Sequence, residues 1–521
     1  MATRARSRVN LKTYPQQLER FLAQYLEAVY RQLAGLQEEM GLAAIYAEHA
    51  DLFGTEAIDA LRERAEGDDA AARQARELLN HALEQHIAAA VADLTDEIEA
   101  AETRAAVIWR DERIPYRQVP NRAADIANRI ARNVLYDSYL EAVEAINPLR
   151  EEKLARVREA VRELGWTDVP AMVAATAGFD PDALAAEMRL FLAESETVYF
   201  AALRRFLAEI DIEQGDASNI DLEHVIRAEG WDRWFEANRM LPAFSATLAG
   251  LGIDLDSQAS ILLDVEPRPQ KSARAFCAPV NVPNDIRLVI QPRGGWDDYA
   301  ALLHEGGHAE HFAHVSPDLP IAWRYLGDNS LTEGYGLLFE RLVGEPAWLG
   351  HIIGMPDDEA AAFADFNAFW YLRLLRAGGA SLLYQLNLHR GEDLAIAREE
   401  YAGMLGLTLG VRYPQETYLE IDDNLYVARY ARAAMVAGSL SAWLQANGGD
   451  PAWWTSRENG AALVRSWSRG QEWNAQDVVA HLGYDHLDWR PVLRQIRTLL
   501  IGEMSGYGGP NITTRAGTRK V

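Results

Sequence analysis

The sequence contains a single cysteine, Cys277, among its 521 residues. One cysteine excludes an intramolecular disulfide and a zinc site built from several thiolates. Such sparse use of cysteine fits a reducing compartment, and we therefore expect a cytoplasmic protein. Secretion is not expected, because charged and polar residues follow the basic N-terminal residues where a signal peptide would have about 7 to 15 apolar ones.

Long apolar runs and an excess of positive charge are also missing. No uncharged apolar stretch reaches the roughly 18 residues needed to cross a bilayer, so we expect no membrane-spanning helix. The 51 Lys and Arg residues are outnumbered by 77 Asp and Glu, and the formal net charge is −26. This charge repels phosphate backbones and anionic lipids, so nucleic acid and membranes are not expected partners. Solubility alone explains such acidity, or a cleft favours cationic substrates; the sequence leaves both open.

The first half of the chain has the composition of a helical protein. From about residue 10 to 230 it is rich in Ala, Glu, Arg and Leu and has few glycines, which predicts helix almost throughout. One predicted helix has Asp180 as its N-cap and Pro181 in its first position, followed by apolar residues at helical spacing. No internal repeat is present, and a solenoid is therefore not expected.

The texture changes between about residues 251 and 296, where prolines alternate with β-favouring runs and predict a small sheet. Helical character returns at 302–315 and in most segments from 331 to 500. The chain is longer than one core usually supports, so we expect an N-terminal helical lobe over 1–230 and a second lobe over 231–501. Residues 502–521 are rich in glycine and polar residues and are expected to form a flexible tail.

The most informative segment is His304-Glu-Gly-Gly-His-Ala-Glu-His311. On a helix, residues four apart lie about 40° apart around the axis and about 6 Å along it, so His304 and His308 can bind one metal ion. Glu305 misses that face but can reach a water in the open coordination position. A shuffled chain of this composition would contain the motif in roughly 4 per cent of cases. The alternative is an exposed helix with two solvated histidines.

A catalytic zinc site typically takes three protein ligands, and Glu333 is the candidate for the third. It lies 25 residues after His308, far enough for the chain to turn and return as a second helix. The alternative is a capping box, in which Ser330 and Glu333 satisfy backbone donors at a helix start.

Four other residues of the motif region invite interpretation. Two adjacent glycines inside a helix, Gly306 and Gly307, indicate close approach of another backbone or a substrate, unless the helix simply tolerates them. His311 lies on the same face as His304 and is expected to orient a ligand, contact substrate or pack in the core; for His314 we expect only packing.

These residues resemble the thimet oligopeptidase family of zinc peptidases, which carries a His-Glu-x-Gly-His-x-x-His signature followed by a glutamate at this spacing. The resemblance makes Glu333 a zinc ligand and matches Gly307, while Gly306 stands at a variable position. It covers about residues 270 to 495.

The segment Tyr426-Val-Ala-Arg-Tyr430 resembles the tyrosine-bearing segment of that family and, in its Arg-Tyr pair, the related angiotensin-converting enzymes. The resemblance gives Tyr430 the role of stabilising the oxyanion, and a phenol hydroxyl suits that task. Tyr426 is a second donor or a substrate contact. The alternative for both is two aromatic residues that pack in a core.

The sequence also departs from the family. Glu420-Ile-Asp-Asp423 stands where relatives have a substrate-binding histidine, and Ala433 replaces a tyrosine. These differences concern substrate recognition rather than the metal. The segment 274–280 resembles the edge strand along which such peptidases bind substrate, which makes Cys277 structural.

The resemblance implies a mainly α fold with two helical lobes around a deep substrate channel and a small β-sheet beside the active-site helix. It implies a zinc metallopeptidase of the gluzincin type with one Zn²⁺ per chain, which hydrolyses oligopeptides as an oligoendopeptidase. The alternatives are a zinc carboxypeptidase, another zinc hydrolase and a non-catalytic helical peptide-binding protein. The sequence leaves cleavage specificity and oligomeric state open. It also leaves open which metal is used in the cell, since such His/His/Glu sites also accept Co or Mn.

Overall fold

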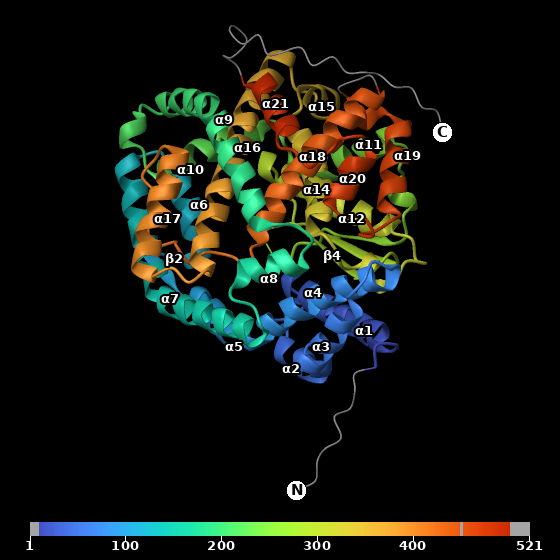
Figure 1. The fold of residues 1–521 in the computed structure, drawn as a ribbon. Helices are drawn as coiled ribbons and strands as arrows, with labels where there is room; N and C mark the ends of the chain where they lie inside the picture. Colours follow the sequence, from blue (N-terminus) through green and yellow to red (C-terminus); the bar gives the residue numbers. More distant parts are fainter. Residues whose placement is uncertain (1–9, 273, 449–451, 501–521) are drawn as a thin grey trace.

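A computed structural model describes residues 10–272, 274–448 and 452–500, and Figure 1 shows that most of this chain is helical. The predicted mainly α fold with a small sheet is confirmed. The predicted tail, 502–521, lies outside the described residues. Within the described part, no helix is long and apolar enough to span a bilayer.

The helices of the first half follow one another with short connections. They are α1 Tyr14–Leu33, α2 Leu42–Glu48, α3 Thr55–Arg64, α4 Ala70–Ala90, α5 Ala92–Arg104, α6 Val119–Ala124, α7 Arg129–Glu163, α8 Val169–Thr176, α9 Pro181–Ala208, α10 Asn219–Arg227 and α11 Met240–Gly250. As predicted, α9 starts at Pro181, and the Asp180 side chain accepts a hydrogen bond from the Asp182 backbone. This bond satisfies a donor that would otherwise be unpaired at the helix start.

One element of the first half differs from the helical prediction. Strands β1, Ala106–Trp109, and β2, Glu112–Pro115, form an antiparallel hairpin. Its two turn residues, Arg110 and Asp111, both have positive φ angles, as the tight turns that join twisted strands require. The Ala-rich composition of the surrounding chain conceals this short run of β-branched and aromatic residues.

The predicted small sheet has three strands. They are β3 Ile261–Asp264, β4 Phe276–Asn281 and β5 Asp285–Val289. Strand β5 lies in the middle, parallel to β3 and antiparallel to β4. Strand β4 is thus an edge strand, as the family resemblance implied, and the sheet packs against the helix that follows it.

The second half returns to helix. Its helices are α12 Trp296–His314, α13 Ile321–Arg324, α14 Asn329–Glu340, α15 Pro346–Trp348, α16 Asp357–His389, α17 Leu394–Leu409, α18 Tyr426–Gly448, α19 Arg457–Trp467, α20 Ala475–His481 and α21 Arg490–Leu499. Helix α12 starts six residues before the predicted Leu302, because Asp297 and Asp298 complement the positive end of its dipole.

The helices form two sides of a cavity. Helices α12, α14 and α18 lie on one side, α6, α10 and α17 on the other, and α16 runs between them (Figure 1). A single hydrophobic cluster nevertheless contains residues from Tyr14 to Leu500, so buried side chains from both predicted lobes share it. The lobe boundary near residue 230 stays a prediction.

Candidate metal centre

Helices α12 and α14 pack unusually closely because glycines lie between them. A Cβ atom on Gly307 would lie 2.8 Å from the carbonyl oxygen of Tyr335 and 3.1 Å from the Cα of Gly336. A Cβ on Gly306 would collide with ring atoms of Phe244 on α11. The predicted close approach of another backbone is confirmed for Gly307, which α14 contacts, whereas Gly306 faces an aromatic side chain instead.

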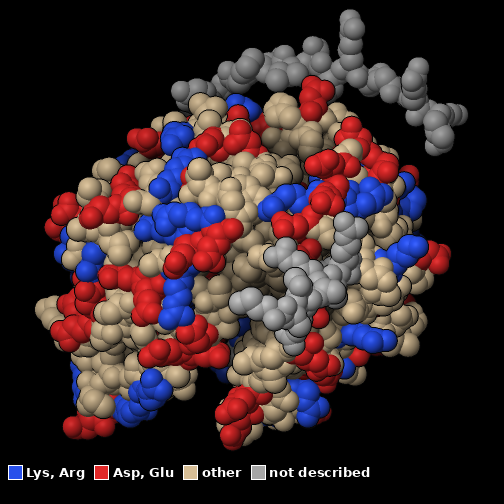
Figure 2. Space-filling view, turned by 60° about the horizontal axis from the view of Figure 1, so that its bottom comes forward, with Lys and Arg blue, Asp and Glu red and all other residues tan. Residues whose placement is uncertain are grey.

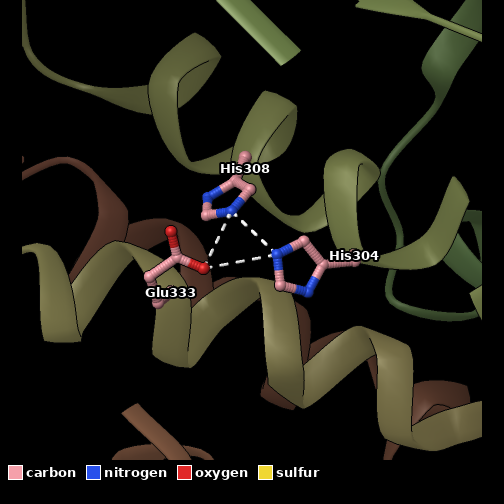
Figure 3. Close-up of side chains that lie close together, drawn as sticks. All are labelled: His304, His308 and Glu333. Atoms are coloured by element: carbon pink, nitrogen blue, oxygen red, sulfur yellow. Dashed lines mark hydrogen bonds and ion pairs between the residues drawn. The ribbon is translucent and has the colours of Figure 1, made fainter. Parts of the chain in front are cut away.

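This close packing brings three predicted ligands together. The Nε2 atoms of His304 and His308 lie 3.1 Å apart, and Oε2 of Glu333 lies 3.3 Å from the first and 3.6 Å from the second (Figure 3). Ligands bound to tetrahedral zinc at its usual bond lengths are about 3.3 to 3.4 Å apart. The three atoms therefore have the spacing of a zinc site.

The electrostatics of the three residues also fit a cation. Oε2 of Glu333 is buried and accepts no hydrogen bond, a costly state for a carboxylate oxygen. Burial lowers the pKa of His304, but the carboxylates of Glu333 and Glu340 outweigh this effect and raise it well above its usual value. The cluster thus favours a positive charge between these residues, which a proton or a metal ion can supply.

Each predicted ligand has a hydrogen-bonding partner behind it. Nδ1 of His304 lies 2.7 Å from Oε2 of Glu340, and Nδ1 of His308 lies 3.0 Å from Oγ1 of Thr332. The hydroxyl of Tyr426 donates to Oε1 of Glu333 at 2.8 Å. Such partners orient metal ligands, and an acceptor behind an imidazole N–H also increases the basicity of the imidazole.

Glu340 and Thr332 were not among the residues predicted from the sequence. Glu340 follows Glu333 by seven residues, which is two helical turns and places both on one face of α14. That spacing was available as a signal. The sequence offered no comparable signal for Thr332, because its hydrogen-bonding partner His308 lies on another helix.

We expect Glu340→Gln to weaken zinc binding by about 10- to 100-fold, because the amide is a poorer acceptor for the His304 N–H. Competition with a chromogenic chelator measures the affinity. Unchanged zinc affinity in a variant with the wild-type circular dichroism spectrum would contradict this role.

The capping alternative for Glu333 is wrong. Helix α14 is capped by Asp328, whose side chain accepts from the Ser330 backbone N–H. Ser330 lies inside the helix, and its hydroxyl oxygen accepts from Arg432 on α18. The Glu333 carboxylate is consequently free to face His304 and His308.

Glu305 lies on the cavity side of α12 and is held by the edge strand. Its Oε2 accepts a hydrogen bond from the backbone N–H of Cys277 on β4 at 2.9 Å. Burial raises the pKa of Glu305, and the Glu333 carboxylate adds to this effect, while both histidines oppose it. Burial and Glu305 also raise the pKa of Cys277, so the thiol stays protonated and a nucleophilic role is not supported.

The two tyrosines of α18 differ in their surroundings. Tyr430 is 44% exposed and lines the cavity, so the core-packing alternative is wrong for it. Tyr426 lies behind it, with ring centroids 5.4 Å apart, and its hydroxyl is engaged by Glu333. Only Tyr430 is therefore placed to meet a molecule in the cavity.

The remaining histidines of the motif are packed. His311 is buried, its Nδ1 lies 3.3 Å from Oγ1 of Thr332, and burial lowers its pKa to about 3. His311 therefore helps to hold Thr332, which contacts His308. His314 contacts the backbone of Glu310, as the packing prediction expected.

The cavity beside these residues has a volume of about 960 Å³. His304, Glu305, Glu340 and Tyr430 form part of one wall, and residues of α6, α10, α16 and α17 form the others. Figure 2 shows the lower face of the molecule, which is hollowed between its two parts and has Asp and Glu side chains on both sides of the hollow. A cavity of this size accommodates several residues of an extended peptide.

A comparison with solved structures found a crystal structure of a protein provisionally named oligoendopeptidase F, with a TM-score of 0.68. The alignment covers 95% of this chain and 97% of that chain, with 14% sequence identity. The two chains share a fold. The sequence matches no protein-family profile and no curated protein.

The shared fold extends over nearly the whole chain, so the helical first half belongs to it as much as the motif region. The positions that depart from the family pattern have definite places in it. Glu420, Ile421 and Asp422 line the cavity, whereas Ala433 is fully buried in α18. The difference at Glu420–Asp422 therefore lies in the cavity wall, and the difference at Ala433 lies in the core.

Proposed function

We propose that this protein is a zinc-dependent peptidase that hydrolyses oligopeptides in the cavity. The observation that carries the proposal is the spacing of the ligand atoms of His304, His308 and Glu333 next to Glu305 on the cavity wall. The fold shared with a protein provisionally named oligoendopeptidase F and the resemblance to thimet oligopeptidases support the same function.

A zinc ion bound by His304, His308 and Glu333 would lower the pKa of a water molecule to about 7 and polarise the scissile carbonyl group. The Glu305 carboxylate takes a proton from the attacking water as its oxygen bonds to the carbonyl carbon. Glu305 then passes this proton to the amine nitrogen as the C–N bond breaks.

Other residues hold the reacting groups. The Cys277 N–H fixes one oxygen of Glu305, which leaves the other for the attacking water. Tyr426 holds Glu333 from behind, so we assign it a positioning role instead of the direct role expected from the sequence. Tyr430 donates a hydrogen bond to the oxygen that becomes negative in the transition state.

The edge strand β4 offers a way to align the substrate. The Arg274 and Ala275 residues before it line the cavity, and its outer edge pairs with no strand of the described chain. A peptide in extended conformation would add to this edge through backbone hydrogen bonds at positions other than the Cys277 N–H, which Glu305 holds. Such alignment depends little on the side chains of the peptide.

We expect Tyr430→Phe to lower kcat by about 10² to 10³-fold with little change in KM, because the lost hydrogen bond acts only in the transition state. Steady-state kinetics on one quenched fluorescent peptide measures both constants. Tyr484→Phe, outside the cavity, serves as the control and should behave as wild type. A kcat within twofold of wild type for Tyr430→Phe would remove this residue from the mechanism.

Metal analysis together with cleavage of a mixed quenched fluorescent peptide library tests the proposed function. We expect one equivalent of zinc and cleavage of internal bonds in peptides whose two termini are blocked. Cleavage only of peptides with a free C-terminus would indicate a carboxypeptidase instead. Zinc without turnover of any peptide would indicate another hydrolase or a binding protein, and the absence of bound metal would refute the proposal.

A further inference from the structure

One end of the cavity is formed by the segment between α17 and α18. The Tyr384 hydroxyl on α16 donates to the backbone carbonyl oxygen of Tyr418 at 2.8 Å. Nε2 of His389, also on α16, lies 2.9 Å from the backbone carbonyl oxygen of Asp422. These contacts on either side of Gln385 fix the segment against α16. Glu420, Ile421 and Asp422 consequently line the same end of the cavity as Gln385.

The two carboxylates at this end have different partners. Glu420 accepts hydrogen bonds at one oxygen from Tyr116 and Tyr139 and lies 3.8 Å from Arg150, while its side chain remains 37% exposed. Asp422 accepts a hydrogen bond from the Val427 backbone and forms no ion pair among residues 10–272, 274–448 and 452–500. Burial raises the pKa of Asp422, because its negative charge is poorly solvated.

Gln385 adds an independent observation. Only 2% of this residue is exposed, its Nε2 donates to Oγ of Ser381 at 3.0 Å, and its Oε1 has no hydrogen-bond partner. A Cβ atom on Gly378, on the same helix, would meet no atom within 4 Å, so space lies along this face of α16. A buried acceptor without a donor destabilises the folded protein, and a ligand N–H would offset this cost.

Apolar side chains surround these acceptors. Tyr401, Leu405 and Tyr413 line the same cavity and pack with Ile421 in one hydrophobic cluster. An apolar wall that ends in carboxylates and an amide oxygen matches a long side chain with an apolar stem and a cationic head. Lysine and arginine have this form, whereas the amino terminus of a peptide lacks the stem.

We propose that Gln385, Glu420, Ile421 and Asp422 form a subsite that binds the lysine or arginine side chain of a peptide substrate. This inference rests on the proposed peptidase function and specifies its substrate class. It also assigns a place to part of the negative charge of the chain. The carboxylates and the amide oxygen receive the cationic head, and the aromatic and aliphatic residues contact the stem.

The test uses quenched fluorescent peptides with both termini blocked, in which lysine, acetyl-lysine or norleucine occupies each position in turn. We expect lysine to raise kcat/KM about tenfold over norleucine at one position, and acetyl-lysine to abolish this gain. Glu420→Gln and Asp422→Asn should each reduce this ratio of kcat/KM for lysine over norleucine severalfold. Asparagine can still accept the hydrogen bond from the Val427 N–H. Asp297→Asn, at another part of the cavity wall, is the control and should retain the ratio.

A second measurement keeps the inference separate from catalysis. Fluorescence anisotropy of the same peptides on the zinc-loaded Glu305→Gln protein gives their affinities without turnover, and lysine should bind about tenfold more tightly than norleucine. Equal affinity and equal kcat/KM for both residues at every position would overturn the subsite. A preference that the Glu420 and Asp422 variants leave intact would also overturn it, as would a preference for a free amino terminus over lysine. Lysine-selective binding without cleavage by wild type would uphold the subsite and refute the peptidase.

Discussion

Replacing Glu305 by glutamine is expected to lower kcat by about 10² to 10⁴-fold and to leave zinc binding intact. The amide cannot accept a proton from the attacking water, so general-base catalysis is lost. The side chain keeps its size, and its carbonyl oxygen still accepts the N–H of Cys277. The substitution leaves the imidazoles of His304 and His308, the proposed ligands, unchanged.

Zinc content by elemental analysis and single-turnover cleavage of a library-selected peptide would be measured together. Wild-type zinc content with the expected loss of turnover would support the proposed base. If Glu305→Gln retained more than a tenth of wild-type turnover, another group would have to accept the proton. If the variant lost its zinc, the loss of activity would say nothing about the base, and Glu305→Asp would then serve as a second variant.

Replacing Glu333 by glutamine is expected to weaken zinc binding by more than about 100-fold, a larger effect than the loss of an outer partner. The substitution removes the one negatively charged ligand and leaves two imidazoles. Tyr426 can still donate to the amide oxygen, so the local packing is retained. The loss therefore reports on charge and coordination.

Competition with a chromogenic chelator gives the affinity, and thermal unfolding with and without zinc gives an independent measure, because a ligand that binds only the folded state raises Tm. Glu310→Gln is a matched control. Glu310 is also buried and lies on α12, the helix that carries His304 and His308. Burial raises its pKa to about 8, so it is mostly uncharged at neutral pH. Equal zinc affinity in the two variants would refute Glu333 as a ligand.

Much of the candidate site could be predicted because it depends on local geometry. His304, Glu305 and His308 lie within two turns of one helix, so their relative positions follow from helical periodicity alone. The glycine pair was a second local signal, since its cost within a helix required a close neighbour. The hairpin β1–β2 was missed because a few β-favouring residues carry little weight in a strongly helical region.

The outer partners and the cavity depended on contacts between distant segments. Tyr426 reaches Glu333 across 93 positions of sequence, and Cys277 reaches Glu305 across 28. Glutamate, threonine and tyrosine are common residues, and nothing in their local pattern indicates which of them lies behind a metal ligand. Their roles emerge only when α12, α14, α18 and β4 pack together.

By itself, the sequence determined a mainly helical fold, a metal-binding motif on one helix and an acidic character without a location. Helical spacing and composition suffice for these, because both act between near neighbours in the chain. The tertiary structure decided that Glu333 completes the triangle with His304 and His308, that Tyr430 faces the cavity while Tyr426 supports Glu333, and that acidic residues line one cavity end. These depend on the packing of helices far apart in sequence, where small residues permit contact and buried polar groups must find partners.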